Sequence, residues 1–207
     1  MQIHNFSFLE DKALALGAIC ATILPAEMVV VEHRIPLKCK TGCVGYGKKL
    51  TCPPYVPSVD EFKKIIREYQ DVLLIQFRSA ALLEPEVAQA PYRTWLDPST
   101  PEDIHQKANL FWKTYFENSK EIHMVMLELE KTAYLAGYPN ALALVNGSCR
   151  LCETCNIKEG ICRFPALARI PEHAVGINMQ KTAKNAGITL NFPARDHPTP
   201  MAILLIE

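Results

Sequence analysis

The sequence predicts an α+β fold, a ferredoxin-like sandwich of a sheet and helices that carries two cysteine-rich loops. Short apolar runs rich in β-branched residues alternate with longer segments of helical spacing, as expected for helices packed on a sheet. The order strand, cysteine loop, helix, strand occurs twice, in residues 27–80 and 120–207, which points to an internal duplication. An irregular segment, 83–100, and a helix join these halves, and we expect residues 1–207 to form a single domain.

The first half is expected to begin with a helix and a strand. Ser7 and Glu10 have the spacing of a capping box, so a helix should start there and run to about Ala18. The β-branched run at 28–34 indicates a strand, which Pro36 closes.

A second helix and strand are expected after the first cysteine loop. Ser58 and Glu61 form another capping-box pattern. Apolar residues recur at helical spacing from Phe62 to Tyr69, so one face of this helix should be buried. The apolar run at 72–77 indicates the next strand.

The longest predicted helix opens the second half. Pro101, followed by two acidic residues, is typical of a helix start, and the helical pattern reaches Ala136. We expect a break near Asn118 and Ser119, and Gly137 suits the position after the last turn.

The remaining pattern predicts strands at 141–145, 188–192 and 201–206, and a short helix at 178–186. If strands 28–34 and 141–145 are parallel, both cysteine loops leave the same edge of the sheet. The two loops would then be neighbours.

Charge and hydropathy exclude several classes of protein. The chain has 22 basic and 22 acidic residues, whereas nucleic-acid binding usually requires a basic excess. No segment reaches the ~18 continuous apolar residues of a membrane helix, and the first residues lack the basic start of an export signal. We therefore expect a cytoplasmic protein that binds neither nucleic acid nor membrane. Disulfides are disfavoured in that compartment, so clustered cysteines indicate metal-binding loops.

Four cysteines of the second loop have a spacing that suits an iron–sulfur cluster. They are Cys149, Cys152, Cys155 and Cys162. The first three follow one another as in bacterial ferredoxins, and the fourth comes six residues later, with Pro165 just beyond it. We predict that all four bind one [4Fe–4S] cluster. Zinc is the alternative, although zinc sites typically use two Cys-x2-Cys pairs separated by a longer span.

The first loop supplies only three clustered cysteines. They are Cys39, Cys43 and Cys52. Three thiolates would hold a second [4Fe–4S] cluster with one iron open to water, sulfide, substrate or a non-cysteine ligand. The alternative is a closed structural site, completed by His33, Asp60 or a thiol of the second loop. The other histidines, His173 among them, do not have the spacing of a metalloprotease helix motif.

Both loops also carry basic residues. They are Lys38, Lys40, Lys48, Lys49, Arg150, Arg163 and Arg169. A cluster ligated by four thiolates is anionic, so nearby cations should stabilise it and raise its potential. A pocket for an anionic substrate is the alternative explanation.

Residues 39–57 and 147–165 resemble the cysteine motifs of a prokaryotic family of uncharacterised predicted metal-binding proteins, a domain of unknown function. The resemblance extends from about Val29 to Leu190. It implies metal binding through the seven clustered cysteines and leaves the activity open.

We therefore expect an iron–sulfur protein with one or two [4Fe–4S] clusters and redox or cluster-based chemistry of an anaerobic type. Its partner would be a redox protein or a small-molecule substrate. Two alternatives are an electron-transfer or metal-carrier module without catalysis of its own, and a structural zinc protein. The sequence does not decide whether the protein is an enzyme.

Overall fold

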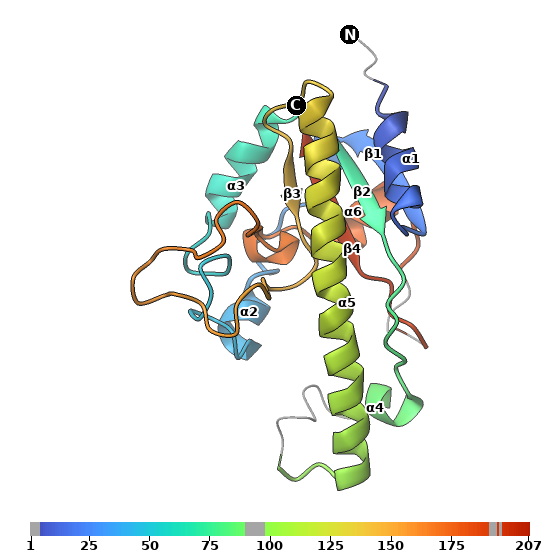
Figure 1. Cartoon of the computed structure of the whole chain (residues 1–207), viewed down its shortest axis with the longest axis vertical. Coiled ribbons are helices and arrows are strands. Elements are labelled where there is room, and N and C mark those ends of the chain that lie inside the picture. Colours follow the sequence, from blue (N-terminus) through green and yellow to red (C-terminus); the bar gives the residue numbers. More distant parts are fainter. Residues whose placement is uncertain (1–4, 90–97, 191–193, 195) are drawn as a thin grey trace.

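The computed structural model describes residues 5–89, 98–190, 194 and 196–207. Within these residues, one antiparallel sheet has the strand order β1-β2-β4-β3. Its strands are β1 (Cys20–Pro25), β2 (Asp71–Gln76), β3 (Leu142–Leu144) and β4 (Met201–Ile206). Helices lie on both faces of the sheet, which confirms an α+β fold (Figure 1). The internal duplication stays a prediction.

The two central strands are buried on both faces because their sequences are nearly continuous apolar runs. β2 and β4 pair side by side, with Val72 opposite Leu205 and Leu73 opposite Leu204. Side chains alternate along each strand, so Leu73 and Leu204 enter one core while Val72 and Leu205 enter the other. The predicted strands at 72–77, 141–145 and 201–206 are thus confirmed within a residue or two.

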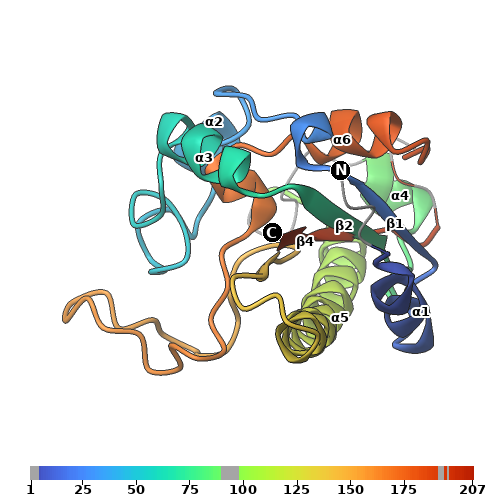
Figure 2. The ribbon, with the colours of Figure 1, turned by 90° about the horizontal axis from the view of Figure 1, so that it is seen from above.

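Two helices cover the first face, as the view from above shows (Figure 2). They are α1 (Ser7–Ala15) and α5 (Glu102–Leu135). Leu9 of α1 and Met126 and Leu129 of α5 are fully buried against the sheet. The N-terminal half of α5 extends beyond the sheet, beside the short helix α4 (Pro85–Gln89) (Figure 1).

Shorter helices cover the second face (Figure 2). They are α3 (Val59–Ile65), α6 (Met179–Asn185) and the 3-10 helices η1 (Ala26–Met28), η2 (Ile66–Glu68) and η4 (Glu172–Val175). Phe62, Val175 and Ala183 are buried there against Leu74 and Ile203. The helix predicted at 178–186 is confirmed as α6, while α2 (Leu37–Gly42) belongs to the first cysteine loop.

The strand predicted at 28–34 is wrong, because other groups satisfy its backbone. The Val30 amide donates to Thr182 Oγ1 (3.0 Å), and the Val30 carbonyl accepts from the Asn178 amide (2.7 Å). The following residue forms only an isolated bridge with Ile177. The start of α6 therefore holds this segment, and the edge strand of the sheet lies earlier, at β1.

One of the two predicted capping boxes forms. Ser58 Oγ accepts from the Glu61 amide (3.3 Å), and Glu61 Oε2 accepts from the Ser58 amide (2.7 Å), so α3 starts as predicted. The box predicted at Ser7 is wrong. The Glu10 carboxylate instead accepts from the amide of Ile23 in β1, 3.0 Å away. Helix α1 also ends three residues before the predicted position.

Helix α5 runs without the break predicted near Asn118 and Ser119. The Ser119 hydroxyl donates to the Tyr115 carbonyl one turn earlier (2.9 Å), so it bonds within the helix without interrupting it. Helix α4 lies inside the segment predicted as irregular, 83–100, of which 90–97 fall outside the described residues.

The strand predicted at 188–192 does not form in its described part, 188–190. The Ile188 amide bonds to the Ala183 carbonyl (2.8 Å) and closes the end of α6 instead. Residues 191 and 192 lie outside the described residues. No helix in the described part of the chain combines the length and apolar character needed to cross a membrane.

Candidate metal centre

The first cysteine loop connects η1 to α3 and places its three cysteines in different environments. Cys39 lies in α2 and is buried, as is Cys52 further along, whereas Cys43, at the end of α2, is exposed. Successive turns fold the loop: the Tyr46 amide bonds to the Cys43 carbonyl (3.1 Å) and the Cys52 amide to the Lys49 carbonyl (3.0 Å). Backbone bonds therefore give this loop a defined path although it contains only one short helix.

The second cysteine loop, residues 146–170, contains turns and bends but neither helix nor strand. Its four cysteines are all partly buried. The loop starts directly after β3, and the Val145 amide bonds to the Ile170 carbonyl (3.0 Å), which joins the two ends of the loop. Between its two ends, the conformation of the loop is therefore set by local turns and by contacts with the rest of the protein.

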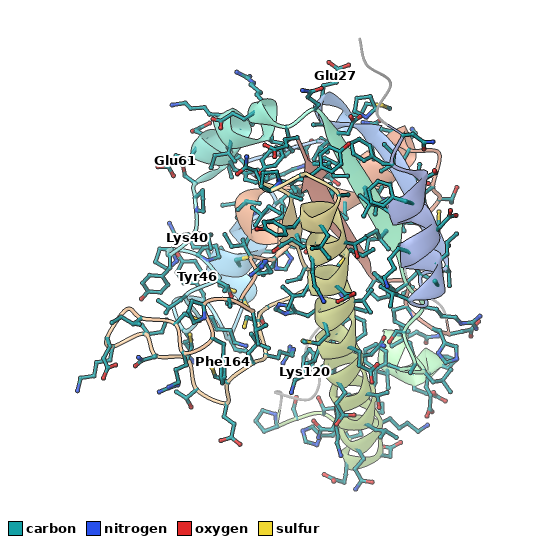
Figure 3. All side chains as sticks on the ribbon, turned by 45° about the horizontal axis from the view of Figure 1, so that its top comes forward. Glu27, Lys40, Tyr46, Glu61, Lys120 and Phe164 are labelled. Atoms are coloured by element: carbon teal, nitrogen blue, oxygen red, sulfur yellow. The ribbon has the colours of Figure 1, made fainter. Side chains whose placement is uncertain are left out.

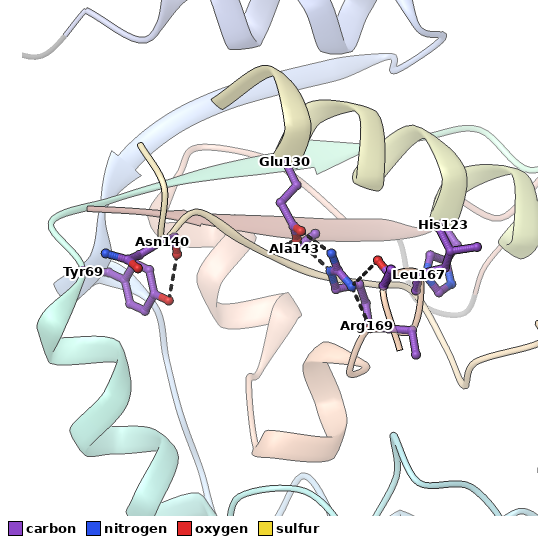
Figure 4. A network of polar contacts seen from close by, with 9 residues as sticks. Tyr69, His123, Glu130, Asn140, Ala143, Leu167 and Arg169 are labelled. Atoms are coloured by element: carbon purple, nitrogen blue, oxygen red, sulfur yellow. Dashed lines mark hydrogen bonds and ion pairs between the residues drawn. The ribbon is translucent and has the colours of Figure 1, made fainter. Parts of the chain in front are cut away.

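Helix α5 anchors the C-terminal end of the second loop (Figure 4). Arg169 donates from Nε to Glu130 Oε2 (2.8 Å) and from Nη2 to Glu130 Oε1, and both side chains are about five-sixths buried. Glu130 also accepts from the Ala143 amide of β3 (2.7 Å). His123 Nε2 lies 2.7 Å from the Leu167 carbonyl. These contacts fix the loop's exit against both α5 and the sheet.

The two cysteine loops lie side by side, next to α5 (Figures 1 and 2). The Leu50 amide of the first loop points at Cys155 Sγ of the second (3.4 Å), and Lys49 Nζ donates to the Cys149 carbonyl. The loops are therefore neighbours, as expected. The expected cause, parallel strands at 28–34 and 141–145, is wrong because the first of these is no strand and the sheet is antiparallel.

Cations and sulfur atoms meet where the loops touch. Burial raises the pKa of Cys52 to about 11, against the opposing effect of Lys49. Burial also raises the pKa of Cys149, and it lowers the pKa of Lys49 and of Arg150. Arg150 lies 3.4 Å over the ring centre of Phe116 on α5. Thiols that lose their protons to a metal here would face two partly buried positive charges.

Side chains of both loops project from one corner of the protein. Figure 3 labels Lys40 and Tyr46 of the first loop and Phe164 of the second, which lie at this corner. Phe164 is 43% exposed and Val44 58% exposed, so the corner presents apolar as well as basic groups to solvent.

The sequence did not single out one further pair of titratable groups, Glu172 and His173, whose side chains lie 3.4 Å apart. Both residues belong to η4 on the second face of the sheet, just after the second cysteine loop. Although burial disfavours the charged ring, the Glu172 carboxylate and a hydrogen bond with Cys39 raise the pKa of His173 to about 10. No sequence signal marks this contact, because 134 positions separate Cys39 from His173.

The two non-cysteine ligands suggested for the first loop face each other instead. His33 Nε2 lies 3.1 Å from Asp60 Oδ1, and both side chains are largely exposed. In this structure, therefore, the two side chains contact each other.

The donor atoms have the chemistry for metal binding but are not gathered into a finished site. All eight cysteines are free thiols, and seven lie in the two touching loops. Across the described ranges, no group of three or more His, Cys, Asp or Glu side chains is arranged to hold a metal ion. Thiolates suit zinc and iron–sulfur clusters.

In a comparison with protein families, the family described as "Predicted metal-binding protein (DUF2284)" matches residues 22–206. The match includes both cysteine loops and the whole sheet except the first two residues of β1. Comparisons with curated proteins and with solved structures give no match.

Proposed function

Since the chain belongs to this family of predicted metal-binding proteins, we propose that it is an iron–sulfur protein with two neighbouring sites. The second loop holds a [4Fe–4S] cluster through four thiolates, and the first loop holds another through three. The ligands are Cys149, Cys152, Cys155 and Cys162 in the second loop, and Cys39, Cys43 and Cys52 in the first.

The contact between the loops is the observation that supports this proposal most strongly. The Leu50 amide donates toward Cys155 Sγ, the type of N–H···S bond that stabilises a ligating sulfur and tunes its potential. Lys49 lies close enough to Cys52, Cys149 and Cys155 to interact with the charge of each. Anionic clusters are stabilised by such surroundings.

The architecture also favours electron transfer. Two clusters in touching loops would be close enough to exchange electrons, and the corner that carries them is exposed. We therefore infer a cytoplasmic redox role of anaerobic type, with electrons passed to a partner protein or to a small substrate bound at the three-cysteine site. The alternative, an electron-transfer or metal-carrier module without catalysis of its own, would use the same two sites.

The proposal is tested by anaerobic purification followed by iron, acid-labile sulfide and zinc analysis. Cys149→Ser and Cys39→Ser should each remove one cluster, about four iron atoms per chain. Cys20→Ser is the matched control: Cys20 lies in β1, and its Sγ is 3.7 Å from Thr22 Oγ1, so its loss should leave iron content unchanged. Stoichiometric zinc without sulfide would replace this proposal by the structural zinc protein.

A further inference from the structure

The two cysteine loops differ in charge from the rest of the protein. Residues 37–57 carry four lysines and no acidic residue, and residues 146–170 carry four basic and two acidic residues. The two stretches together have a formal net charge of +6, and because the whole chain is neutral, the other residues together have −6. We call the surface formed by residues 37–57 and 146–170 the cysteine corner.

Much of this positive charge lies at the surface without an acidic partner. Lys38 and Lys40 are exposed on α2, on either side of the buried Cys39, and Lys48 is exposed further along the same loop. In the described part of the chain, the ion pairs include none of these three lysines. Their ammonium groups are therefore free to attract an anionic partner.

Large apolar side chains are exposed on the same surface. Ile161 is 67% exposed, more than Val44 and Phe164. The other exposed apolar side chains of the corner are Leu37, Tyr55 and Leu167. Exposed apolar groups that lie among charged ones are typical of protein interaction sites.

The cysteine corner is one surface because its two loops touch. The Leu50 amide reaches Cys155 Sγ, and Lys49 Nζ donates to the Cys149 carbonyl. Lys40 and Tyr46 of one loop and Phe164 of the other lie at this corner in Figure 3. Cys43 is exposed here, so a protein bound at the corner would lie directly against a candidate cluster ligand.

We propose that the cysteine corner is the docking surface for an acidic electron-carrier protein. This inference rests on the proposed function, because that function supplies the clusters with which such a carrier exchanges electrons. The lysines steer an acidic partner toward the corner and orient it. The apolar side chains supply contact area that loses water when the two proteins meet.

Two other anionic surfaces fit the apolar groups less well. Sites for single-stranded nucleic acid stack bases on aromatic side chains, whereas Val44, Ile161 and Leu167 are aliphatic. Membrane surfaces are typically bound by long amphipathic helices, whereas the helix of this corner, α2, has six residues. An acidic protein matches both the charge and the apolar groups.

The first test titrates the full chain, purified anaerobically, with a small acidic ferredoxin and with a flavodoxin in a calorimeter. We expect binding to at least one carrier. Its affinity should fall by about tenfold or more when ionic strength rises from about 0.01 to 0.1 M, because the Debye length shrinks from about 30 to about 10 Å. No binding to either carrier at the lower ionic strength, or an affinity independent of salt, overturns the proposal. Tighter binding to duplex DNA or to phosphatidylglycerol vesicles also overturns it.

Charge reversal locates the docking surface. The corner variant combines Lys38→Glu, Lys40→Glu and Lys48→Glu. The matched control makes the same change of net charge at three exposed positions outside the corner: Arg67→Glu, Lys131→Glu and Lys184→Glu. The corner variant should bind the carrier about tenfold or more weakly, and the control should lose much less. Equal losses in the two variants would show that only net charge matters, and would refute docking at the corner.

A second variant tests the apolar contacts without changing any charge. Ile161→Ser combined with Phe164→Ser should weaken carrier binding while leaving its salt dependence in place. Circular dichroism and thermal unfolding of each variant separate a lost contact from a failure to fold. Unchanged affinity in this folded double variant refutes the apolar part of the interface.

The outcomes distinguish this inference from the proposed function. Iron and sulfide in a chain that binds neither carrier would overturn the docking surface and leave the clusters standing. Carrier binding that the corner variant loses, in a chain that contains no iron, would support the docking surface and overturn the iron–sulfur function.

Discussion

The ion pair between Arg169 and Glu130 should be a main anchor of the second cysteine loop. Its side chains are 16% and 15% exposed, and it joins the loop's exit to α5. Arg169→Ala leaves the Glu130 carboxylate with the Ala143 amide as its remaining described partner. Breaking a buried pair on one side costs about 3–5 kcal/mol. Because Glu130 keeps that amide bond and some solvent contact, we expect about 3 kcal/mol.

The assay is thermal and urea unfolding of the metal-free chain. A loss of about 3 kcal/mol should lower the melting temperature by roughly 6–12 °C for a chain of this size. Arg169→Met combined with Glu130→Gln should recover much of the loss, because no unpaired charge then stays buried.

The matched control is the exposed pair Lys12 and Glu128, 3.9 Å apart, with side chains 38% and 42% exposed. Lys12→Ala should cost less than about 1 kcal/mol, as exposed pairs do. Equal losses in Arg169→Ala and Lys12→Ala would refute the claim that burial makes the Arg169 pair important.

Three further predictions concern the fold. Burial lowers the pKa of His123 below 6.5. Its contribution to the free energy of unfolding is therefore present above pH 6.5 and is lost as pH falls through the folded pKa. Between pH 7 and 5 the wild type should lose more stability than His123→Gln, and equal losses in calorimetry would contradict this. Ser58→Ala removes the acceptor of the Glu61 amide and should cost about 1 kcal/mol in urea unfolding, whereas an unchanged midpoint would show that α3 does not depend on its cap. Leu204→Ala, at a fully buried position in β4, should cost about 3 kcal/mol, and a loss below about 1 kcal/mol would mean that the core collapses around the gap.

Elements whose signals are local could be predicted from the sequence. The box at Ser58 and Glu61 satisfies amides within one turn, so four residues suffice to specify it. The apolar runs of β2 and β4 predict central strands, because a strand in the centre of a covered sheet is buried on both faces. The cysteine spacing in the second loop likewise indicates a metal-binding segment without knowledge of its surroundings.

Local patterns failed where a distant group competed for the same backbone. Residues 28–34 have the composition of a strand, but Thr182 Oγ1, 152 positions away, takes the Val30 amide. Glu10 has the spacing of a capping residue, but the Ile23 amide takes its carboxylate. In both cases a hydrogen bond to another element replaced the one that the pattern implied, and sequence spacing does not record such partners.

By itself, then, the sequence identified the candidate metal ligands: seven thiols in two groups, four and three. Only the tertiary structure decided that the loops touch and that Lys49 lies close to sulfur atoms of both. The physical reason is that ligand chemistry belongs to each side chain, whereas the approach of residues more than a hundred positions apart depends on how the whole sheet and its helices pack.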